Sequence, residues 1–213
     1  MIKIFNIIQI VIISASVALS VYFYQHFPAR VPMHWNIAGE IDGWSSRGFG
    51  AFLFPVILIA IYFLFEILPK IDPRRANYPE FKKVYSIFKT AIMAIFFGIY
   101  ILTGLSGLGV KVAVDLWVPA GIGLLFIILG NYFGKLRNNY FVGIRTPWTL
   151  SNEEVWNKTH RLGGKLFILG GVAMMLMGVI PVGIRVAVFI AVVLMISVVP
   201  ILYSYIIHKK LSK

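Results

Sequence analysis

Long apolar runs separated by short polar segments dominate this sequence. The runs cover approximately residues 4–27, 49–68, 84–108, 116–134, 164–180 and 185–207. Each approaches the roughly 20 residues that a helix needs to cross about 30 Å of hydrocarbon. They lack the period-two alternation that barrel strands show. We therefore predict an all-α polytopic membrane protein with six transmembrane helices, surrounded by the lipid bilayer.

The composition supports this class. Of the 213 residues, 59% are hydrophobic and 13% are charged, whereas soluble domains carry about 25% charged residues. The chain has no cysteine, which excludes disulfides, thiolate metal sites and cysteine nucleophiles. Lys3 and the apolar stretch after it imitate a secretory signal peptide. The stretch is longer than a signal core and lacks a clear cleavage site, so we expect a retained first helix.

The basic residues predict the orientation. Sixteen of the twenty Lys and Arg fall at the N-terminus, the C-terminus and the loops around 70–83 and 135–163. The other four are Arg30, Arg47, Lys111 and Arg185. Because cytoplasmic loops are enriched in Lys and Arg, both termini are predicted to be cytoplasmic. The net charge of +12 then faces lipid headgroups, and we expect no direct contact with nucleic acid.

The predicted outer loop, about residues 28–48, carries turn-forming residues among aromatic ones. Trp35 and Trp44 are candidate interfacial anchors. His34, Glu40 and Asp42 are candidate ligands for a divalent cation. An equally simple interpretation is that the two carboxylates satisfy backbone groups of a tight loop and that His34 packs against Trp35. No other cofactor is expected.

The predicted inner loop, residues 135–163, holds a capping-box pattern from Ser151 to Glu154. We expect a short interfacial helix over 152–162, ended by Gly163 and Gly164. Pro147 interrupts regular helix before it. Five residues are expected to converge at the cytoplasmic mouth of the bundle: Asn138, Asn139, Arg145, Trp148 and His160. This group is either a polar recognition surface or an interfacial anchor.

Two features lie inside the apolar runs. Glu66 is a candidate functional carboxylate, or it pairs with Lys70 one turn away. Gly164, Gly171 and Gly178 recur every seven residues, which favours close packing against another helix. The sequence has no G-x-S-x-G, H-E-x-x-H or P-loop motif, and we do not expect an enzyme.

Two strings carry a family resemblance. GNYFGKLRNNYFVGIRTPWTLSNEEVWNKTHRLGG resembles the core signature of the SdpI family of bacterial membrane proteins, and PMHWNIAGEIDGW resembles the N-terminal domain often fused to it. The matching outer positions are His34, Trp35, Asn36, Gly39, Asp42 and Gly43. The matching inner positions are Asn131, Asn139, Gly143, Arg145, Thr146, Pro147, Trp148, Thr149, Trp156, His160 and Arg161.

The resemblance implies a function. The family is named for an immunity protein that protects a producing cell from its own secreted killing peptide, and it is also described as a receptor that holds a transcriptional repressor at the membrane. A protein of this kind would sit in the bacterial cytoplasmic membrane, with a secreted peptide toxin as its outer partner and a cytoplasmic repressor as its inner one. The outer-loop residues that we expect to bind the ligand or toxin are His34, Trp35, Asn36, Glu40, Asp42 and Trp44.

The resemblance also divides the chain and its inner residues. Residues 1–75 would form an N-terminal helix pair with the outer loop, and 84–213 a four-helix domain. The inner residues expected to bind a partner or support structure are Asn139, Arg145, Thr146, Pro147, Trp148, Trp156, His160 and Arg161. The alternative function is a small-solute transporter or a metal-dependent membrane enzyme that uses His34, Glu40 and Asp42.

Overall fold

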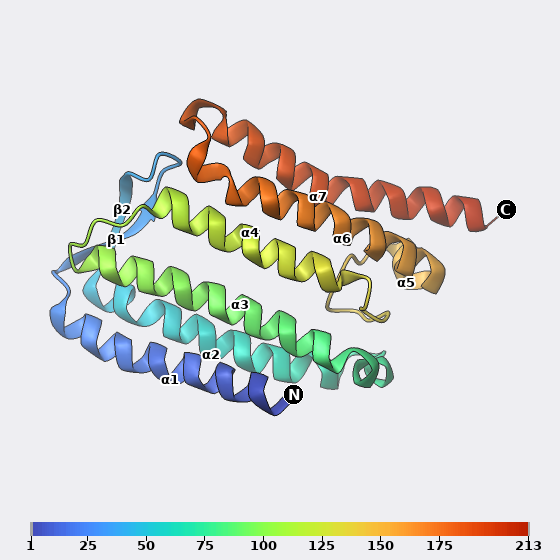
Figure 1. Cartoon of the computed structure of the whole chain (residues 1–213). Helices are drawn as coiled ribbons and strands as arrows, with labels where there is room; N and C mark the ends of the chain where they lie inside the picture. Colours follow the sequence, from blue (N-terminus) through green and yellow to red (C-terminus); the bar gives the residue numbers. More distant parts are fainter. Residues whose placement is uncertain (1, 213) are drawn as a thin grey trace.

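Six long helices run side by side in the computed structural model, which describes residues 2–212 (Figure 1). All six are long and apolar enough to cross a membrane. This confirms the predicted all-α polytopic class. The helices are α1 (Ile2–His26), α2 (Arg47–Ile71), α3 (Tyr78–Gly107), α4 (Val114–Phe133), α6 (Glu153–Met175) and α7 (Val182–Leu211). Shorter helical segments are η1 (Arg75–Asn77), α5 (Pro147–Ser151) and η2 (Met177–Val179).

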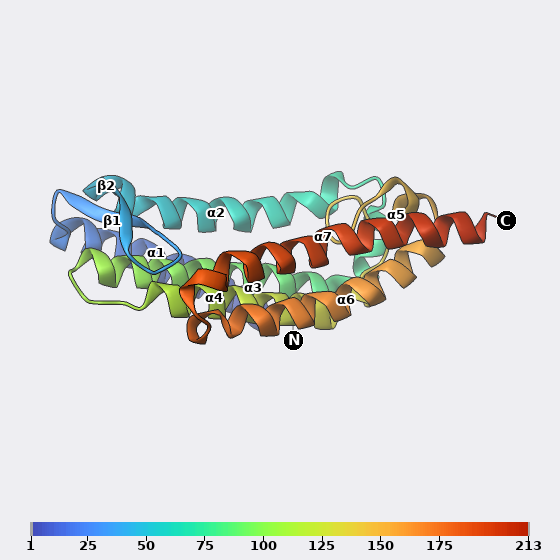
Figure 2. The same cartoon turned by 90° about the horizontal axis from the view of Figure 1, so that it is seen from above.

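The bundle consists of two groups of three helices. Helices α1, α2 and α3 pack against one another, and α6 packs between α4 and α7. Helix α3 also contacts α4 and so joins the two groups, as Figures 1 and 2 show. The division into domains 1–75 and 84–213 stays a prediction. Helix α3, which falls in the second of these domains, packs against α1 and α2 of the first and against α4 of the second.

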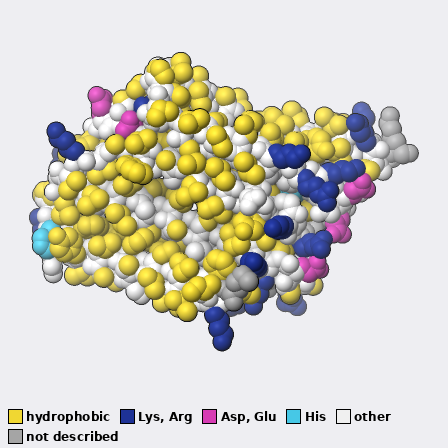
Figure 3. All heavy atoms as spheres, viewed as in Figure 1, with side chains coloured by type: hydrophobic (Ala, Val, Ile, Leu, Met, Phe, Trp, Pro, Cys, Tyr) yellow, Lys and Arg dark blue, Asp and Glu magenta, His cyan; other side chains and the backbone are white. Residues whose placement is uncertain are grey.

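The two ends of the bundle differ in charge. Both termini lie at the end opposite the strands (Figure 1), and most of the Lys and Arg visible in Figure 3 gather at that same end. We therefore call this end inner and the other end outer. The charge count assigned Lys89 to the loop around 70–83, which is wrong. Lys89 lies within α3 with its side chain 3% exposed.

The outer loop forms a β-hairpin, which the sequence analysis missed. Strands β1 (Arg30–Trp35) and β2 (Ile41–Ser46) pair antiparallel, with irregular register around His34. The turn between them needs Gly39, whose φ of +83° is a left-handed conformation that glycine adopts without strain. Gly43, another turn-forming residue of this loop, lies opposite His34 where the register shifts.

The predicted separate helix over 152–162 is wrong in its bounds. The short inner-loop helix is α5, and residues 153–175 form one continuous helix, α6, capped by Asn152 rather than Ser151. Gly163 and Gly164 do not end this helix. A Cβ on Gly164 would lie 2.6 Å from the carbonyl oxygen of Gly130 on α4, so the glycine permits a close helix contact instead.

The predicted glycine packing stripe is confirmed. A Cβ on Gly171 would lie 2.5 Å from the carbonyl oxygen of Gly123 in α4, and Gly178 faces the side chain of Leu116. Helices α4 and α6 thus approach at backbone distance along most of their length. Small residues at such an interface provide van der Waals contact, which drives helix association in lipid.

Candidate functional site

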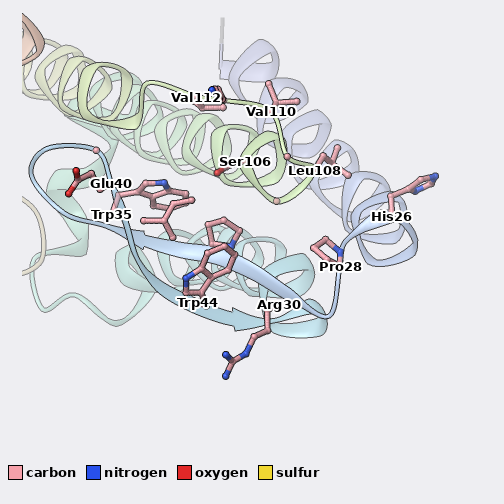
Figure 4. Close-up of a pocket in the computed structure, with 16 residues that line it drawn as sticks. His26, Pro28, Arg30, Trp35, Glu40, Trp44, Ser106, Leu108, Val110 and Val112 are labelled. Carbon is pink, nitrogen blue, oxygen red and sulfur yellow. The ribbon is translucent and has the colours of Figure 1, made fainter.

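A pocket opens on the outer end of the bundle, between the hairpin and the α3–α4 connection. Its volume is about 650 Å³. Figure 4 shows Trp35 and Trp44 on the side of the hairpin that faces this connection, whereas Arg30 points away. The Trp44 residue is 57% exposed. The lining residues are His26, Pro28, Arg30, Pro32, Trp35, Gly39, Glu40, Ile41, Trp44 and 106–112.

Asn36 shapes the hairpin turn. Its Oδ1 accepts hydrogen bonds from the backbone N–H groups of Ala38 and Glu40, both at 3.0 Å, and its Nδ2 donates to Glu40 Oε2 at 2.8 Å. Such side-chain bonds to nearby backbone are typical of Asn in turns. Glu40 is therefore held within the turn, but its carboxylate bonds a side-chain amide and not the backbone groups that the structural interpretation of this loop expected.

His34 and Asp42 form a cross-strand pair. His34 Nδ1 lies 2.5 Å from Asp42 Oδ1, with the two side chains 72% and 44% exposed. Glu40, the third candidate metal ligand, bonds to Asn36 instead. Across residues 2–212, no group of three or more His, Asp or Glu side chains is placed to hold a metal ion. The metal site stays a prediction, which metal analysis of the purified protein tests.

Arg185 anchors the hairpin to the bundle. From α7, its guanidinium donates to Asp115 Oδ2 on α4 at 2.9 Å and to the carbonyl oxygen of Ile37 in the hairpin turn at 3.2 Å. It also reaches the carbonyl oxygens of Gly178 and Ile180. Arg185 was predicted only as one of the four outer basic residues. Arg185 lies at the start of one apolar run and Asp115 at the start of another, and these positions could have indicated that the two residues pair.

Asp72 organises the inner end of the bundle. This residue is 2% exposed. Its Oδ2 accepts hydrogen bonds from the Tyr78 hydroxyl and the backbone N–H of Tyr140, both at 2.9 Å, and its Oδ1 accepts from the N–H of Arg74 at 2.7 Å. Asp72 thus ties the α2–α3 connection to the long inner loop. The sequence analysis did not single it out, because nothing local distinguishes it from a surface aspartate.

Arg74 extends this connection. Its guanidinium bonds Asn138 Oδ1 and, at 2.7 Å, the carbonyl oxygen of Leu150. Asn138 in turn donates to the carbonyl oxygen of Thr149 at 3.1 Å and accepts from Asn77 through its own backbone oxygen at 2.7 Å. The bonds made by Arg74 and Asn77 join segments more than 60 residues apart in the chain.

Two predicted inner residues, Asn139 and Thr146, serve the backbone around them. The Asn139 side chain donates to the carbonyl oxygens of Arg137 and Val142 and accepts from the N–H groups of residues 141 and 142. Thr146 caps α5 through a reciprocal pair of bonds with Thr149, and its hydroxyl meets that of Ser204 on α7 at 3.0 Å. The irregular loop therefore meets its hydrogen-bonding needs internally, as backbone near a membrane must.

His160 and Trp156 form the buried base of the inner loop. Trp156 Nε1 donates to the carbonyl oxygen of Leu136 at 2.9 Å. His160 Nε2 accepts from the N–H of Ile144 at 2.9 Å, so Nδ1 carries the proton and donates to the carbonyl oxygen of Trp156 at 2.8 Å. Gly143, with φ of +112°, lets the chain pass close to His160 Nε2, because a Cβ at this position would clash with that atom.

The five residues expected to converge separate into two sets. Asn138, Asn139 and His160 are buried together in the inner loop. Arg145 is exposed and bonds the carbonyl oxygen of Tyr140 at 2.9 Å, while the Trp148 ring lies 5.1 Å from that of Tyr205 on α7. The remaining predicted residues Pro147 and Arg161 are exposed. The inner loop therefore has a buried polar interior and an exposed rim.

Within the membrane span, Glu66 pairs with a residue other than the one predicted. Its Oε1 lies 2.6 Å from Lys89 Nζ on α3, not from Lys70. The Lys89 ammonium also lies 3.6 Å from the centre of the Tyr62 ring, a cation–π distance. The i, i+4 rule suggested a partner on the same helix, but Lys89 is the buried cation that needs a counter-charge.

Two matches to known families cover separate parts of the chain. Residues 135–204 match the SdpI/YfhL protein family, and residues 11–59 match a domain of unknown function, DUF1648. The Immunity protein SdpI of Bacillus subtilis (strain 168) is 28% identical over 207 residues, which are 97% of each chain. No solved structure matches.

Six apolar helices, a basic inner end and this whole-length relative define a multi-pass protein of the cell membrane. The resemblance drawn from the GIRTPWTL and PMHWN strings is confirmed. The chain is similar to the SdpI/YfhL family over residues 135–204 and to the DUF1648 domain over residues 11–59.

Proposed function

We propose that this protein protects its cell from a secreted antimicrobial peptide, which it contacts at the outer pocket. The observation that carries the proposal is the pocket of about 650 Å³ at the outer end, lined by Trp35 and Trp44. A peptide that attacks from outside reaches this end first. The relative that spans the chain is named an immunity protein, which supports the same conclusion.

The pocket has the chemistry that an amphipathic peptide requires. Tryptophan provides large contact area and is enriched among residues that dominate binding energy. The exposed Glu40 and Lys111 add one charge of each sign at the pocket wall. Membrane-active peptides combine Lys or Arg with aromatic and aliphatic residues, and a wall with aromatic rings and a carboxylate accommodates both.

Survival of a sensitive bacterium tests the function. Cells that express the protein should survive concentrations of a membrane-active peptide that kill cells carrying an empty vector. Trp44→Ala should reduce this protection, because it removes the exposed ring from the pocket. Trp117→Ala is the matched control, since Trp117 is 58% exposed and does not line the pocket. Unchanged killing curves across a peptide panel would overturn the proposal.

A second function, retention of a cytoplasmic repressor, is favoured by the shape of the inner rim. A polar groove of about 390 Å³ lies there between the α2–α3 connection and the inner loop, and its lining includes Arg74, Glu80, Arg137 and Glu153. Exposed Arg145 and Arg161 lie on the same inner loop and α6. We propose that this rim is the surface that meets the repressor.

Co-purification tests this second function. A DNA-binding protein should accompany the membrane protein from detergent extracts of its own host, and Arg145→Ala should abolish the association. Lys158→Ala is the control, because Lys158 pairs with Glu154 on its own helix at 2.7 Å. Association that survives Arg145→Ala, or none with the native chain, contradicts a repressor-binding rim.

A further inference from the structure

A second cavity lies between α1, α2 and α3 near the inner end of the bundle. Its volume is about 510 Å³. Three residues from one face of α1 line it, namely Ile2, Asn6 and Gln9. The other lining residues come from α2, η1 and α3: Phe65, Glu66, Pro69, Lys70, Arg75, Tyr78, Pro79, Lys82, Tyr85, Ser86 and Lys89. This cavity shares no lining residue with the outer pocket or with the inner groove described above.

The cavity is cationic. Lys70, Arg75 and Lys82 are exposed at its wall. Among the residues that the structure describes, no carboxylate lies within salt-bridge distance of these three. Glu66, the acidic residue of the lining, is already paired with Lys89 at 2.6 Å. Three positive charges therefore face the cavity without a protein counter-charge, which favours an anionic ligand.

The buried amide of Gln9 supplies a second, independent indication of a ligand. Gln9 is 1% exposed, and its Nε2 donates to Thr90 Oγ1 at 2.7 Å. Its Oε1 has no hydrogen-bond partner within residues 2–212. Buried polar atoms are nearly always hydrogen-bonded. If the amide oxygen and nitrogen are exchanged, the oxygen bonds Thr90 and Nε2 becomes the atom without a hydrogen-bond partner. A hydroxyl group, which both donates and accepts, would satisfy either arrangement.

The depth of the cavity matches the inner headgroup layer. Lys70 belongs to the last turn of α2, and Arg75 belongs to the connection at the basic inner end. Lys82 and Lys89 are seven residues apart on α3, so the lining continues about 10 Å from the rim toward the membrane centre. Ile2, Phe65, Pro69 and Pro79 add apolar surface. A polar, anionic head attached to an apolar tail fits such a lining.

We propose that this cavity binds the headgroup of one anionic phospholipid of the inner leaflet, of the class whose headgroup carries free hydroxyls, such as phosphatidylglycerol. The phosphate lies among Lys70, Arg75 and Lys82, and a headgroup hydroxyl meets the free amide atom of Gln9. The bound lipid bridges the three N-terminal helices. This proposal does not depend on the immunity function.

Lipid titration of the full chain in detergent, followed by native mass spectrometry, tests the site. Phosphatidylglycerol should form a one-to-one adduct at concentrations at least tenfold lower than phosphatidylcholine. Arg75→Gln and Lys82→Gln should each weaken it about fivefold, as expected for one basic residue near an anionic headgroup. Lys83→Gln is the matched control, because Lys83 is exposed beside Lys82 but does not line the cavity.

Two further arms identify the ligand. The native chain should bind phosphatidylglycerol more tightly than phosphatidic acid, whose headgroup is a phosphate without an alcohol hydroxyl. Gln9→Leu should remove this preference, while binding of phosphatidic acid persists. Soluble glycerol phosphate should not displace the lipid at millimolar concentration; displacement would assign the site to a free phosphate ester and overturn the lipid. Equal binding of phosphatidylcholine, or an equal loss with Lys83→Gln and Lys82→Gln, would also overturn it. The surface variants Arg75→Gln and Lys82→Gln carry the test if Gln9→Leu fails to fold.

Discussion

Arg185 donates a hydrogen bond to Asp115 at 2.9 Å, which joins the beginning of α7 to the beginning of α4. The two side chains are 9% and 25% exposed. The same guanidinium group bonds the backbone of Ile37 in the hairpin turn. The pair therefore fixes the position of the hairpin, and with it one wall of the outer pocket, against the second group of helices.

Loss of one partner of this pair should destabilise the outer end. Asp115→Asn leaves the Arg185 charge buried without its counter-ion, at a cost of about 3 kcal/mol. We expect faster proteolysis within residues 30–46 and a lower temperature at which the detergent-solubilised protein aggregates. Glu80→Gln is the control, because the Glu80–Arg137 pair is about half exposed and such pairs contribute at most about 1 kcal/mol. Equal effects of the two changes would contradict an anchoring role.

The contact between α4 and α6 should not tolerate a methyl group. Gly164→Ala places a Cβ 2.6 Å from the Gly130 carbonyl oxygen, and backbone cannot move aside as a side chain can. Overpacking of this kind costs about 1–3 kcal/mol. Thermal aggregation in detergent, read by size-exclusion chromatography, measures the loss. Gly98→Ala has nothing within 4 Å of its new Cβ and should be neutral; a matching loss there would refute the packing argument.

The sequence predicted those features that depend on local pattern or on bulk charge. The apolar runs predicted the six spans, the Lys and Arg distribution predicted that both ends of the chain lie at one basic end of the bundle, and the seven-residue spacing of Gly164, Gly171 and Gly178 predicted a packing interface. Each of these is a property of one segment or a sum over loops, so no knowledge of the tertiary contacts was required.

Contacts between distant segments escaped prediction. Glu66 was assigned to Lys70 because only helix neighbours can be inferred from spacing, and its partner Lys89 lies 23 positions away. Asp72 and Arg74 gain their roles from residues 138–150, and Arg185 gains its role from Asp115. The hairpin was missed because its bulged register breaks the alternation that marks a strand.

The Glu66–Lys89 pair should respond as a unit. Glu66→Gln removes the negative charge beside a lysine whose side chain is 3% exposed. Because the amide oxygen of Gln can still accept from Lys89 Nζ, we expect a loss of at most about 2 kcal/mol, less than for the full removal of a buried partner. Glu66→Gln combined with Lys89→Gln should recover much of that stability, because no buried charge then lacks a partner. The measurement is the temperature at which each variant aggregates in detergent. If this temperature falls in the double variant by the sum of the falls in Glu66→Gln and Lys89→Gln, the two residues are not directly coupled.

The absence of cysteine allows a direct test of orientation. Ala38→Cys in the hairpin turn and Ala76→Cys in η1 replace two exposed alanines at opposite ends of the bundle. A membrane-impermeant maleimide should label Ala38→Cys in intact cells and should label Ala76→Cys only after the cells are permeabilised. The reverse pattern would invert the assigned orientation.

The central claim, that the outer pocket contacts the peptide, is tested most directly by blocking the pocket in living cells. Val110→Cys places a thiol on a pocket residue that is 50% exposed, whereas Ala38→Cys places one on the same outer face at an exposed residue that does not line the pocket. Cells expressing each variant are treated with a bulky impermeant maleimide and then exposed to a peptide against which the native chain protects. We predict that labelled Val110→Cys cells die like cells without the protein, while labelled Ala38→Cys cells survive. Full protection by labelled Val110→Cys would contradict the claim.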